Sequence, residues 1–204
     1  MTRFILVRHG QTEWNRLERF RGRADVPLNE VGLAQAEATG RRVAAEWRPA
    51  AVYSSPLSRA VKTAEAIARR CDRDVQHHPG LVDIDFGAWQ GLTLAEARQN
   101  WPDEIDAWYN RPHLANIPGG EVLDKLRLRA LQTVNELVDR HPGETIVLVG
   151  HTVINRIILL GILRLGNERF WRLGQDNCAI NVFEAEDGDF TLVSMNDTCH
   201  LHLQ

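Results

Sequence analysis

The stretch Phe4-Ile5-Leu6-Val7, followed at once by Arg8-His9-Gly10, is the part of the sequence that decides the fold. This run of four apolar residues has the length of one buried strand, and Gly10 ends it. Such strands are typical of a parallel sheet that helices cover on both faces. We therefore expect Arg8 and His9 to lie at the carboxyl edge of a sheet.

Short apolar runs alternate with longer helical patterns along the rest of the chain. Residues 51–54 and 145–149 predict two further strands, and residues 75–77 predict a poorer one. Apolar residues at helical spacing predict helices over residues 30–47, from Pro56 to Ala68, over 122–138 and over 153–163. Residues 179–184 and 190–195 predict a hairpin around Asp187-Gly188. The order predicts an α/β fold, with residues 1–204 forming a single three-layer domain whose mostly parallel sheet carries helices on both faces.

Residues 79–120 differ in composition from the rest. They hold four of the eight prolines and three of the six tryptophans. We interpret this stretch as a lid insertion with one or two short helices. Trp89, Trp101 and Trp108 are candidates for the mouth of a substrate pocket, but packing within the lid is the favoured interpretation for most of them.

Composition and charge limit the partners. The formal net charge is −3 over 204 residues, without the basic surplus that nucleic-acid binding requires, so we expect no nucleic-acid partner. The three cysteines form no CxxC pair, which favours a reducing, cytoplasmic setting. The longest apolar stretch, Val153 to Leu165, is interrupted by polar residues, so no membrane span or membrane partner is expected. A homo-oligomer is compatible with the sequence.

Basic and imidazole side chains follow three of the predicted strands. They are Arg8-His9-Gly10, the segment from Ser55 to Arg59, and Gly150-His151-Thr152. Ligands of parallel sheets bind beyond the carboxyl ends of the strands. Guanidinium groups match phosphate oxygens, and a neutral imidazole can attack phosphorus. Two histidines and two arginines at one edge therefore predict a site for a phosphate dianion.

Phosphoryl transfer from an ester also needs a proton donor, because an alkoxide is a poor leaving group. Asp83 and Asp85 stand at alternate positions of an extended segment, so one should face the site and the other away. Glu121 also lies in plausible reach. The residues by themselves leave these three carboxyl groups open.

Six blocks in one order resemble the histidine phosphatase superfamily, which includes cofactor-dependent phosphoglycerate mutase. Together they extend over nearly the whole chain: residues 6–15 (LVRHGQTEWN), 20–22 through 27–32, 53–60 with 63–64, 86–91, 118–121 and 149–152. Arg-His-Gly alone would be a weak signal, whereas the full ordered set is highly specific.

The resemblance implies a role for each matching residue. His9 would be the phosphorylated nucleophile and Asp83 the proton donor. The phosphoryl group would be held by Arg8, Arg59, His151 and Asn15, with help from the backbone at Thr152. The enzyme would act on a small phosphorylated metabolite, as a phosphoric monoester hydrolase without metal or cofactor.

Three positions depart from the family pattern. Asp83 stands where glutamate is more common, and its side chain is shorter by one methylene. Arg21 replaces a glutamine, so Arg21 and Gly22 are candidates for contacting a second anionic group, although a solvated loop is the favoured interpretation of Arg21. Phe86 replaces a histidine found in metal-independent phosphoserine phosphatases, which weakens that substrate assignment.

The sequence leaves two other functions open. A phosphoglycerate mutase-type transfer is one, although the short chain favours hydrolysis. An inactive phospholigand-binding module is the other, although every central residue of the motif is present. Phosphoserine, α-ribazole phosphate and phosphoglycerate all remain candidate substrates.

Overall fold

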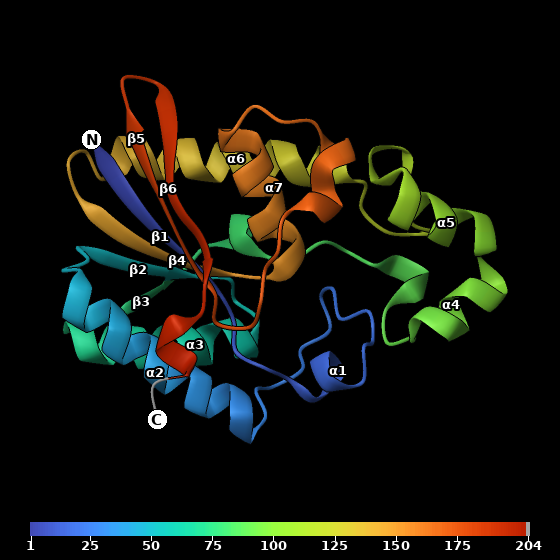
Figure 1. Cartoon of the computed structure of the whole chain (residues 1–204), viewed down its shortest axis with the longest axis horizontal. Helices are drawn as coiled ribbons and strands as arrows, with labels where there is room; N and C mark the ends of the chain where they lie inside the picture. Colours follow the sequence, from blue (N-terminus) through green and yellow to red (C-terminus); the bar gives the residue numbers. More distant parts are fainter. Residues whose placement is uncertain (203–204) are drawn as a thin grey trace.

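A six-stranded sheet lies between two layers of helices in the computed structural model, which describes residues 1–202 (Figure 1). The strand order is β3-β2-β4-β1-β5-β6, and the first four strands are parallel. The antiparallel edge is the predicted hairpin. The strands are β1 (Thr2–Arg8), β2 (Ala51–Ser54), β3 (Val75–His77), β4 (Thr145–Gly150), β5 (Ile180–Glu186) and β6 (Asp189–Asp197). The prediction of an α/β fold with a mostly parallel sheet is confirmed.

Four helices make up the two outer layers. Helices α2 (Glu30–Glu46) and α3 (Ser58–Cys71) cover one face of the sheet, and α6 (Leu123–Arg140) and α7 (Thr152–Ile162) cover the other (Figure 1). All four begin and end within a few residues of the predicted bounds. The sequence patterns did not predict α1 (Glu13–Arg16) or the 3-10 turns at Asn167–Arg172 and Cys199–Leu201. These elements are too short for a periodic pattern to be recognised.

Strand β1 illustrates why a buried parallel strand is apolar on both faces. Phe4 and Leu6 belong to the hydrophobic cluster under α6 and α7, whereas Ile5 and Val7 belong to the cluster under α2 and α3. All four side chains are fully buried. Each such burial stabilises the fold by about 1.5–3 kcal/mol, so β1 is fixed from both sides.

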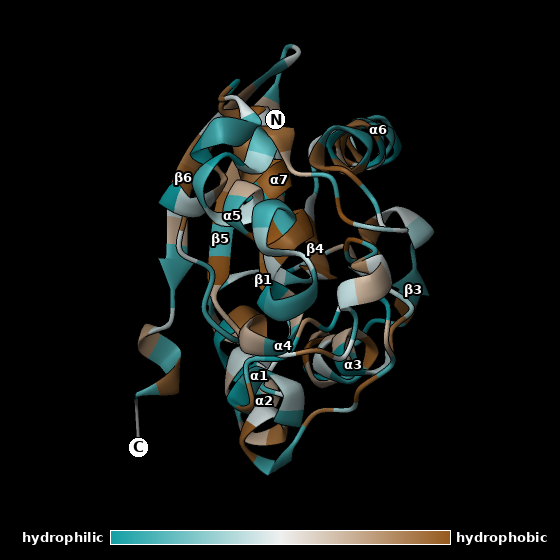
Figure 2. Cartoon of the chain, turned by 90° about the vertical axis from the view of Figure 1, so that its right-hand side faces the viewer, coloured by the Kyte–Doolittle hydropathy of each residue, from teal (hydrophilic) through white to brown (hydrophobic). Residues whose placement is uncertain are grey.

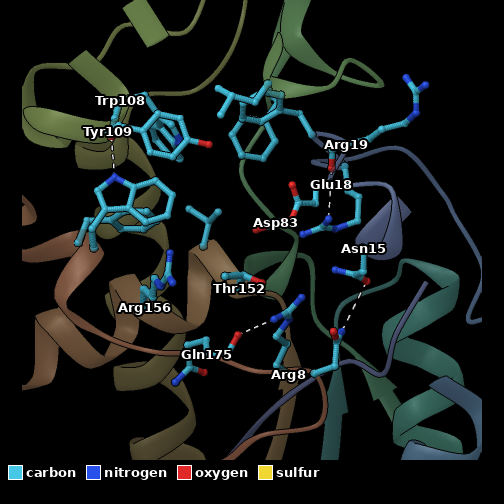
Figure 3. A pocket seen from close by; sticks show the side chains of 18 of the residues that line it. Arg8, Asn15, Glu18, Arg19, Asp83, Trp108, Tyr109, Thr152, Arg156 and Gln175 are labelled. Atoms are coloured by element: carbon cyan, nitrogen blue, oxygen red, sulfur yellow. Dashed lines mark hydrogen bonds between the residues drawn. The ribbon is translucent and has the colours of Figure 1, made fainter. Parts of the chain in front are cut away.

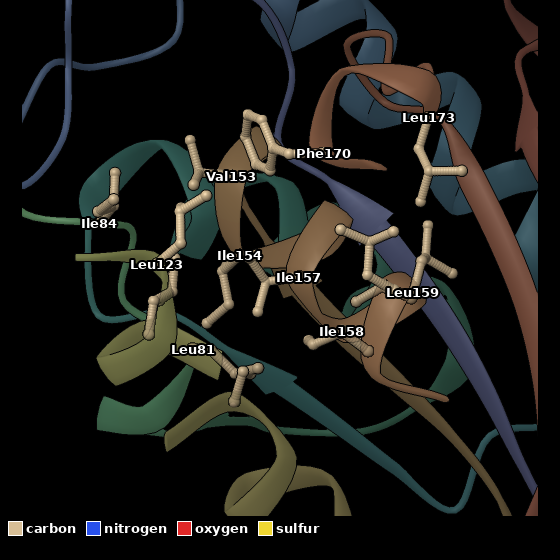
Figure 4. Close-up of a cluster of buried hydrophobic side chains, with 14 of the residues drawn as sticks. Leu81, Ile84, Leu123, Val153, Ile154, Ile157, Ile158, Leu159, Phe170 and Leu173 are labelled. Carbon is tan, nitrogen blue, oxygen red and sulfur yellow. The ribbon is translucent and has the colours of Figure 1, made fainter. Parts of the chain in front are cut away.

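Helix α7 is hydrophobic around most of its circumference, as its brown colour in Figure 2 shows. Eight of its eleven residues are buried, and Ile154, Ile157 and Ile158 pack in the cluster drawn in Figure 4. This packing anchors the amino terminus of α7 at the end of β4. Within the described part of the chain, no helix has both the length and the apolar character that crossing a membrane would need.

The segment 79–120 lies beyond the carboxyl ends of the strands (Figure 1). It contains α4 (Leu94–Asn100), α5 (Pro102–Asn110) and 3-10 turns at Pro79–Leu81, Gly87–Trp89 and Pro112–Leu114. Trp89 and Trp108 are buried, and their rings pack edge to face with centroids 6.2 Å apart, as expected of packing within the segment. Trp108 also lines a cavity, as its other interpretation predicted. That the segment opens and closes as a lid stays a prediction.

Candidate active site

The register of the sheet places His9 beside His151. Strand β1 pairs with β4 so that Arg8 lies opposite Gly150, and the backbone N–H of His9 donates to the Gly150 carbonyl at 3.1 Å. The two imidazole centroids are 5.1 Å apart, and each side chain is at most 1 % exposed. Two histidines 142 positions apart in sequence therefore form one buried pair.

One hydrogen bond defines the tautomer of His9. Its Nδ1 lies 2.6 Å from the Gly10 carbonyl, which can only accept, so the proton is on Nδ1 and the lone pair is on Nε2. Burial lowers the pKa of His9 well below its usual value, and the nearby Arg59 and His151 lower it further. A neutral imidazole with a free Nε2 lone pair is suited to nucleophilic attack.

Ser55 fixes the second histidine. It follows β2, where Ser54 pairs with Val149, and its hydroxyl lies 2.8 Å from Nε2 of His151. Burial, with Arg59 as the next contribution, lowers the pKa of His151 well below its usual value. Ser55 lies at the predicted edge of the sheet, but its role was not predicted, because the contact depends on the β2–β4 register.

Arg59 lies in the first turn of α3 and is fully buried. Its η nitrogens donate to the carbonyls of Ala24 and Gly22, each at 2.7 Å. Gly22 adopts φ +50°, a conformation that suits glycine. Gly22 does not line the cavity, and its carbonyl accepts from Arg59; a contact between Gly22 and substrate stays a prediction. Burial lowers the pKa of Arg59 to about 10.

Arg8 is fixed in a similar way. One of its η nitrogens donates to the Gln175 carbonyl at 2.5 Å. Burial, followed by the repulsion of Arg21 and Arg156, lowers the pKa of Arg8 to about 9, so it is still charged at neutral pH. The charge of a bound dianion would relieve this repulsion.

Asp83 is the buried carboxyl group of the three candidates. It is 4 % exposed, and burial raises its pKa even though Arg59 and Arg21 oppose the shift. A raised pKa favours the protonated form that a proton donor needs. Glu121, by contrast, pairs with Arg129 at 2.9 Å, and Asp85 is half-exposed with Arg23 at 3.6 Å.

A cavity of about 410 Å³ opens above this cluster (Figure 3). Of the predicted site residues, five line it: Arg8, Asn15, Arg21, Asp83 and Thr152. His9, Arg59 and His151 are not in its lining and are buried behind these residues. Asn15 accepts hydrogen bonds from the backbone N–H and hydroxyl of Thr12 through Oδ1, so its amide donor is free to face the cavity.

Buried polar atoms without a partner among residues 1–202 gather at this site. They include Arg8 Nε, Arg59 Nε, Asp83 Oδ1, His151 Nδ1 and Thr152 Oγ1. Buried polar groups nearly always have hydrogen-bond partners, so such a cluster needs an explanation. The donors among these atoms, together with the amino terminus of α7, suit the oxygens of a phosphoryl group.

Arg21 is half-buried in the cavity wall rather than solvated, which corrects the favoured interpretation. Its η nitrogen lies 3.3 Å and 3.2 Å from the carbonyls of Trp14 and Arg19. Arg21 contributes to the pKa of Asp83, so the two side chains lie near each other.

Most residues of the outer cavity wall have no signal in the sequence that would have predicted them. Arg156 could have been found, because it lies four residues after Thr152 on the same side of α7. Tyr109, Trp171 and Gln175 come from separate loops and short helices, and no local pattern links them. Among the described residues, no group of three His, Cys, Asp or Glu side chains is arranged to hold a metal ion.

Comparison with known proteins assigns nearly the whole chain to the family that its sequence motifs resemble. The sequence pattern of the histidine phosphatase superfamily (branch 1) matches residues 4–198. Phosphoserine phosphatase 1 of Hydrogenobacter thermophilus is 33 % identical over 201 residues, which cover 98 % of this chain and 95 % of the relative. A metal-independent phosphoserine phosphatase of Arabidopsis thaliana is 36 % identical over 203 residues, covering 98 % of this chain and 84 % of the relative.

A solved structure supports the assignment. YhfR of Bacillus stearothermophilus superimposes with a TM-score of 0.94 at 32 % identity, covering 98 % of this chain and all of the other. Its fold is thus that of the present chain nearly throughout. The sequence pattern, the relatives and the fold all agree, and the chain therefore belongs to the histidine phosphatase superfamily, branch 1.

Proposed function

We propose that the chain hydrolyses a small phosphomonoester through a phosphohistidine on Nε2 of His9. The two relatives compared above, both named phosphoserine phosphatases, support hydrolysis as the reaction class. The roles of the individual residues are part of the proposal. The observation that supports them best is the neutral His9, with its Nε2 lone pair free beside the unpartnered donors of Arg8, Arg59 and His151.

In the first half of the reaction, Nε2 of His9 attacks phosphorus and the bond from phosphorus to the ester oxygen breaks. Asp83 gives its proton to the departing alkoxide, which leaves as the alcohol. Arg8 and Arg59 balance the charge on the phosphoryl oxygens, and His151 donates through Nδ1. For that donation the Ser55 hydroxyl must donate to Nε2 of His151, which the 2.8 Å contact allows.

In the second half, a water oxygen attacks the phosphohistidine and the phosphorus–nitrogen bond breaks. The Asp83 carboxylate takes a proton from that water, which restores its protonated form and frees the imidazole. Inorganic phosphate leaves. The chain's own groups therefore carry every proton and charge of the cycle, and the catalysis consists mainly of positioning and electrostatic stabilisation.

The test is release of inorganic phosphate from 4-nitrophenyl phosphate, with EDTA present, by wild type and His9→Ala. We expect activity that survives the chelator and falls by at least about a thousandfold in His9→Ala, because the nucleophile is gone. His77→Ala is the matched control, since His77 is an exposed histidine on β3. Chelator-sensitive turnover, or full activity of His9→Ala, would disprove the proposal.

A mutase reaction is separated from hydrolysis by product analysis. With 3-phosphoglycerate as substrate, hydrolysis yields glycerate and free phosphate. Formation of the 2-phospho isomer without free phosphate would instead favour transfer. A protein that binds these esters but converts neither would be the inactive phospholigand-binding module.

A further inference from the structure

Arg156 differs from the other arginines of the cavity wall. Arg8, Arg19 and Arg21 each donate a hydrogen bond from an η nitrogen to a backbone carbonyl. Among residues 1–202, Arg156 uses only Nε, which donates to the Leu173 carbonyl at 2.8 Å, and it forms no ion pair. Its four terminal N–H donors are thus left for another partner.

An aromatic wall holds the guanidinium of Arg156 in place. Its central carbon lies 5.1 Å from the ring centroid of Phe170 and 4.9 Å from that of Trp171. Trp171 is itself fixed, since its indole N–H donates to the Trp108 carbonyl at 2.6 Å and its ring stacks on Tyr109 at 4.9 Å. In Figure 3, Arg156 points into the cavity below Tyr109 and Trp108.

The position of Arg156 suits a contact with the alcohol part of a substrate. It follows Thr152 by four residues on α7, which is about 6 Å along a helix. Both side chains line the cavity. The charge of Arg156 also contributes to the lowered pKa of Arg8, so the two guanidinium groups are close enough to repel each other. A substrate whose phosphoryl group lies at Thr152 would extend toward Arg156.

The charges at the two ends of the cavity differ in number. The inner end has two cations, Arg8 and Arg59, which suit a phosphoryl dianion, and two neutral histidines. At the outer end Arg156 lies against aromatic rings, and its η nitrogens form no hydrogen bond among the described residues. Its planar fork matches a carboxylate monoanion, whereas a second phosphate would bring about two charges to this one guanidinium.

We propose that Arg156 binds a carboxylate on the alcohol part of the substrate. The natural substrate is then a phosphomonoester that carries a carboxylate a few bonds from the ester oxygen. This inference rests on the proposed phosphatase function and deepens it. In this inference Arg156 determines substrate specificity and takes no part in the chemical step.

The test uses two esters that differ at one group. In 3-phosphoglycerate a carboxylate stands where glycerol 3-phosphate has a hydroxymethyl group. We expect wild type to prefer 3-phosphoglycerate in kcat/KM by about 10- to 100-fold, the range for a hydrogen bond to a charged group. Arg156→Gln should lower kcat/KM for 3-phosphoglycerate by that factor, mainly through KM, and change that for glycerol 3-phosphate by less than about threefold.

Two further variants sharpen the result. Arg156→Lys keeps the charge but loses the fork, so an intermediate preference is expected. Arg172→Gln removes an exposed arginine of the same 3-10 turn as Trp171, outside the cavity lining, and should leave the preference of wild type unchanged.

An equal loss for both esters in Arg156→Gln would overturn the inference, because it would indicate a purely structural role. Wild type without a preference for the carboxylate would also overturn it. If wild type then still hydrolyses 4-nitrophenyl phosphate, the proposed function stands and only the role of Arg156 fails. Inactivity toward all three esters would contradict the proposed function itself, and the inference with it.

Discussion

Asp83 is a buried carboxyl group whose proton the proposed mechanism uses. We predict that Asp83→Asn lowers kcat/KM for alkyl phosphates by about 10²- to 10⁴-fold, the range for general acid catalysis. The loss should be much smaller for 2,4-dinitrophenyl phosphate, whose leaving group needs no proton. Steady-state kinetics with both esters checks this. An equal loss for both would show that Asp83 does not protonate the leaving group.

Asp83 should also lower the free energy of unfolding at pH values above its folded-state pKa. Its folded-state pKa is raised by burial, so its contribution to folding is most favourable below the unfolded pKa and is lost as the pH rises through the folded pKa. We predict that Asp83→Asn is more stable than wild type at pH 8, by about 1 kcal/mol, and that this gain shrinks toward pH 4. Urea unfolding of both proteins at the two pH values measures it. A gain independent of pH would contradict the argument.

Ser55 is a positioning residue for His151. We predict that Ser55→Ala lowers kcat/KM by up to about tenfold, the value of one hydrogen bond, because the hydroxyl no longer fixes the imidazole tautomer. Ser55→Thr keeps the hydroxyl and should recover part of the activity. Unfolding curves of the variants provide the control. Full activity of Ser55→Ala at unchanged stability would remove Ser55 from the mechanism.

At the scale of elements, Arg129 joins helix α6 to the segment that carries Asp83. Its guanidinium donates to the carbonyls of Gly80, Val82 and Asp83 at 2.7–3.0 Å and to the Glu121 carboxylate at 2.9 Å and 3.0 Å. Every guanidinium nitrogen is therefore engaged. The segment around Asp83 has no strand pairing of its own, so this arginine replaces a ladder of backbone hydrogen bonds.

We predict that Arg129→Gln reproduces part of the Asp83→Asn phenotype. The kcat/KM for alkyl phosphates should fall by about 10-fold or more, with a smaller loss for 2,4-dinitrophenyl phosphate, because misplaced Asp83 transfers its proton less well. Kinetics with the same two esters measures the difference. A uniform loss for both esters would instead indicate that Arg129 only supports the fold.

At the scale of the whole molecule, the two buried histidines make stability depend on pH. The folded-state pKa values of His9 and His151 are depressed, so their contribution is present above the unfolded value of 6.5 and is lost as the pH falls below it. We predict that the free energy of unfolding decreases below pH 6.5 by up to about 1.4 kcal/mol per pH unit for each histidine.

Unfolding by urea between pH 5 and 7 measures this slope. In that range the carboxylates with lowered pKa values, such as Glu37 and Asp197, still carry their charge. Asp83, whose pKa burial raises, would act in the opposite direction, so the slope is measured in Asp83→Asn. Bound inorganic phosphate should also stabilise the protein, because it binds only the folded state. A flat profile from pH 7 to 5 in Asp83→Asn would mean that the two imidazoles take up protons in the folded protein as readily as in the unfolded chain.

The sequence by itself determined the order of strands and helices and the edge of the sheet at which the candidate site lies. The spacing of apolar residues, the β-branched runs and the residues that stop helices are all local signals. Elements α2, β2 and β4 accordingly lie at or close to the predicted residues. The family motif named His9, Arg8, Arg59 and His151, and the sheet order explains how they meet. Short elements such as α1 were missed, because one turn of helix has no periodic pattern.

Only the tertiary structure decided which groups face one another. The alternation at Asp83 and Asp85 left two choices, and burial of one carboxyl group with pairing of the other separates them. The β2–β4 register brings Ser55 to His151, and the packing of α5 on the 3-10 turn at Asn167–Arg172 places Trp171 behind Arg156. These contacts join residues tens of positions apart. Their energies depend on burial and distance in space, which a local sequence pattern does not encode.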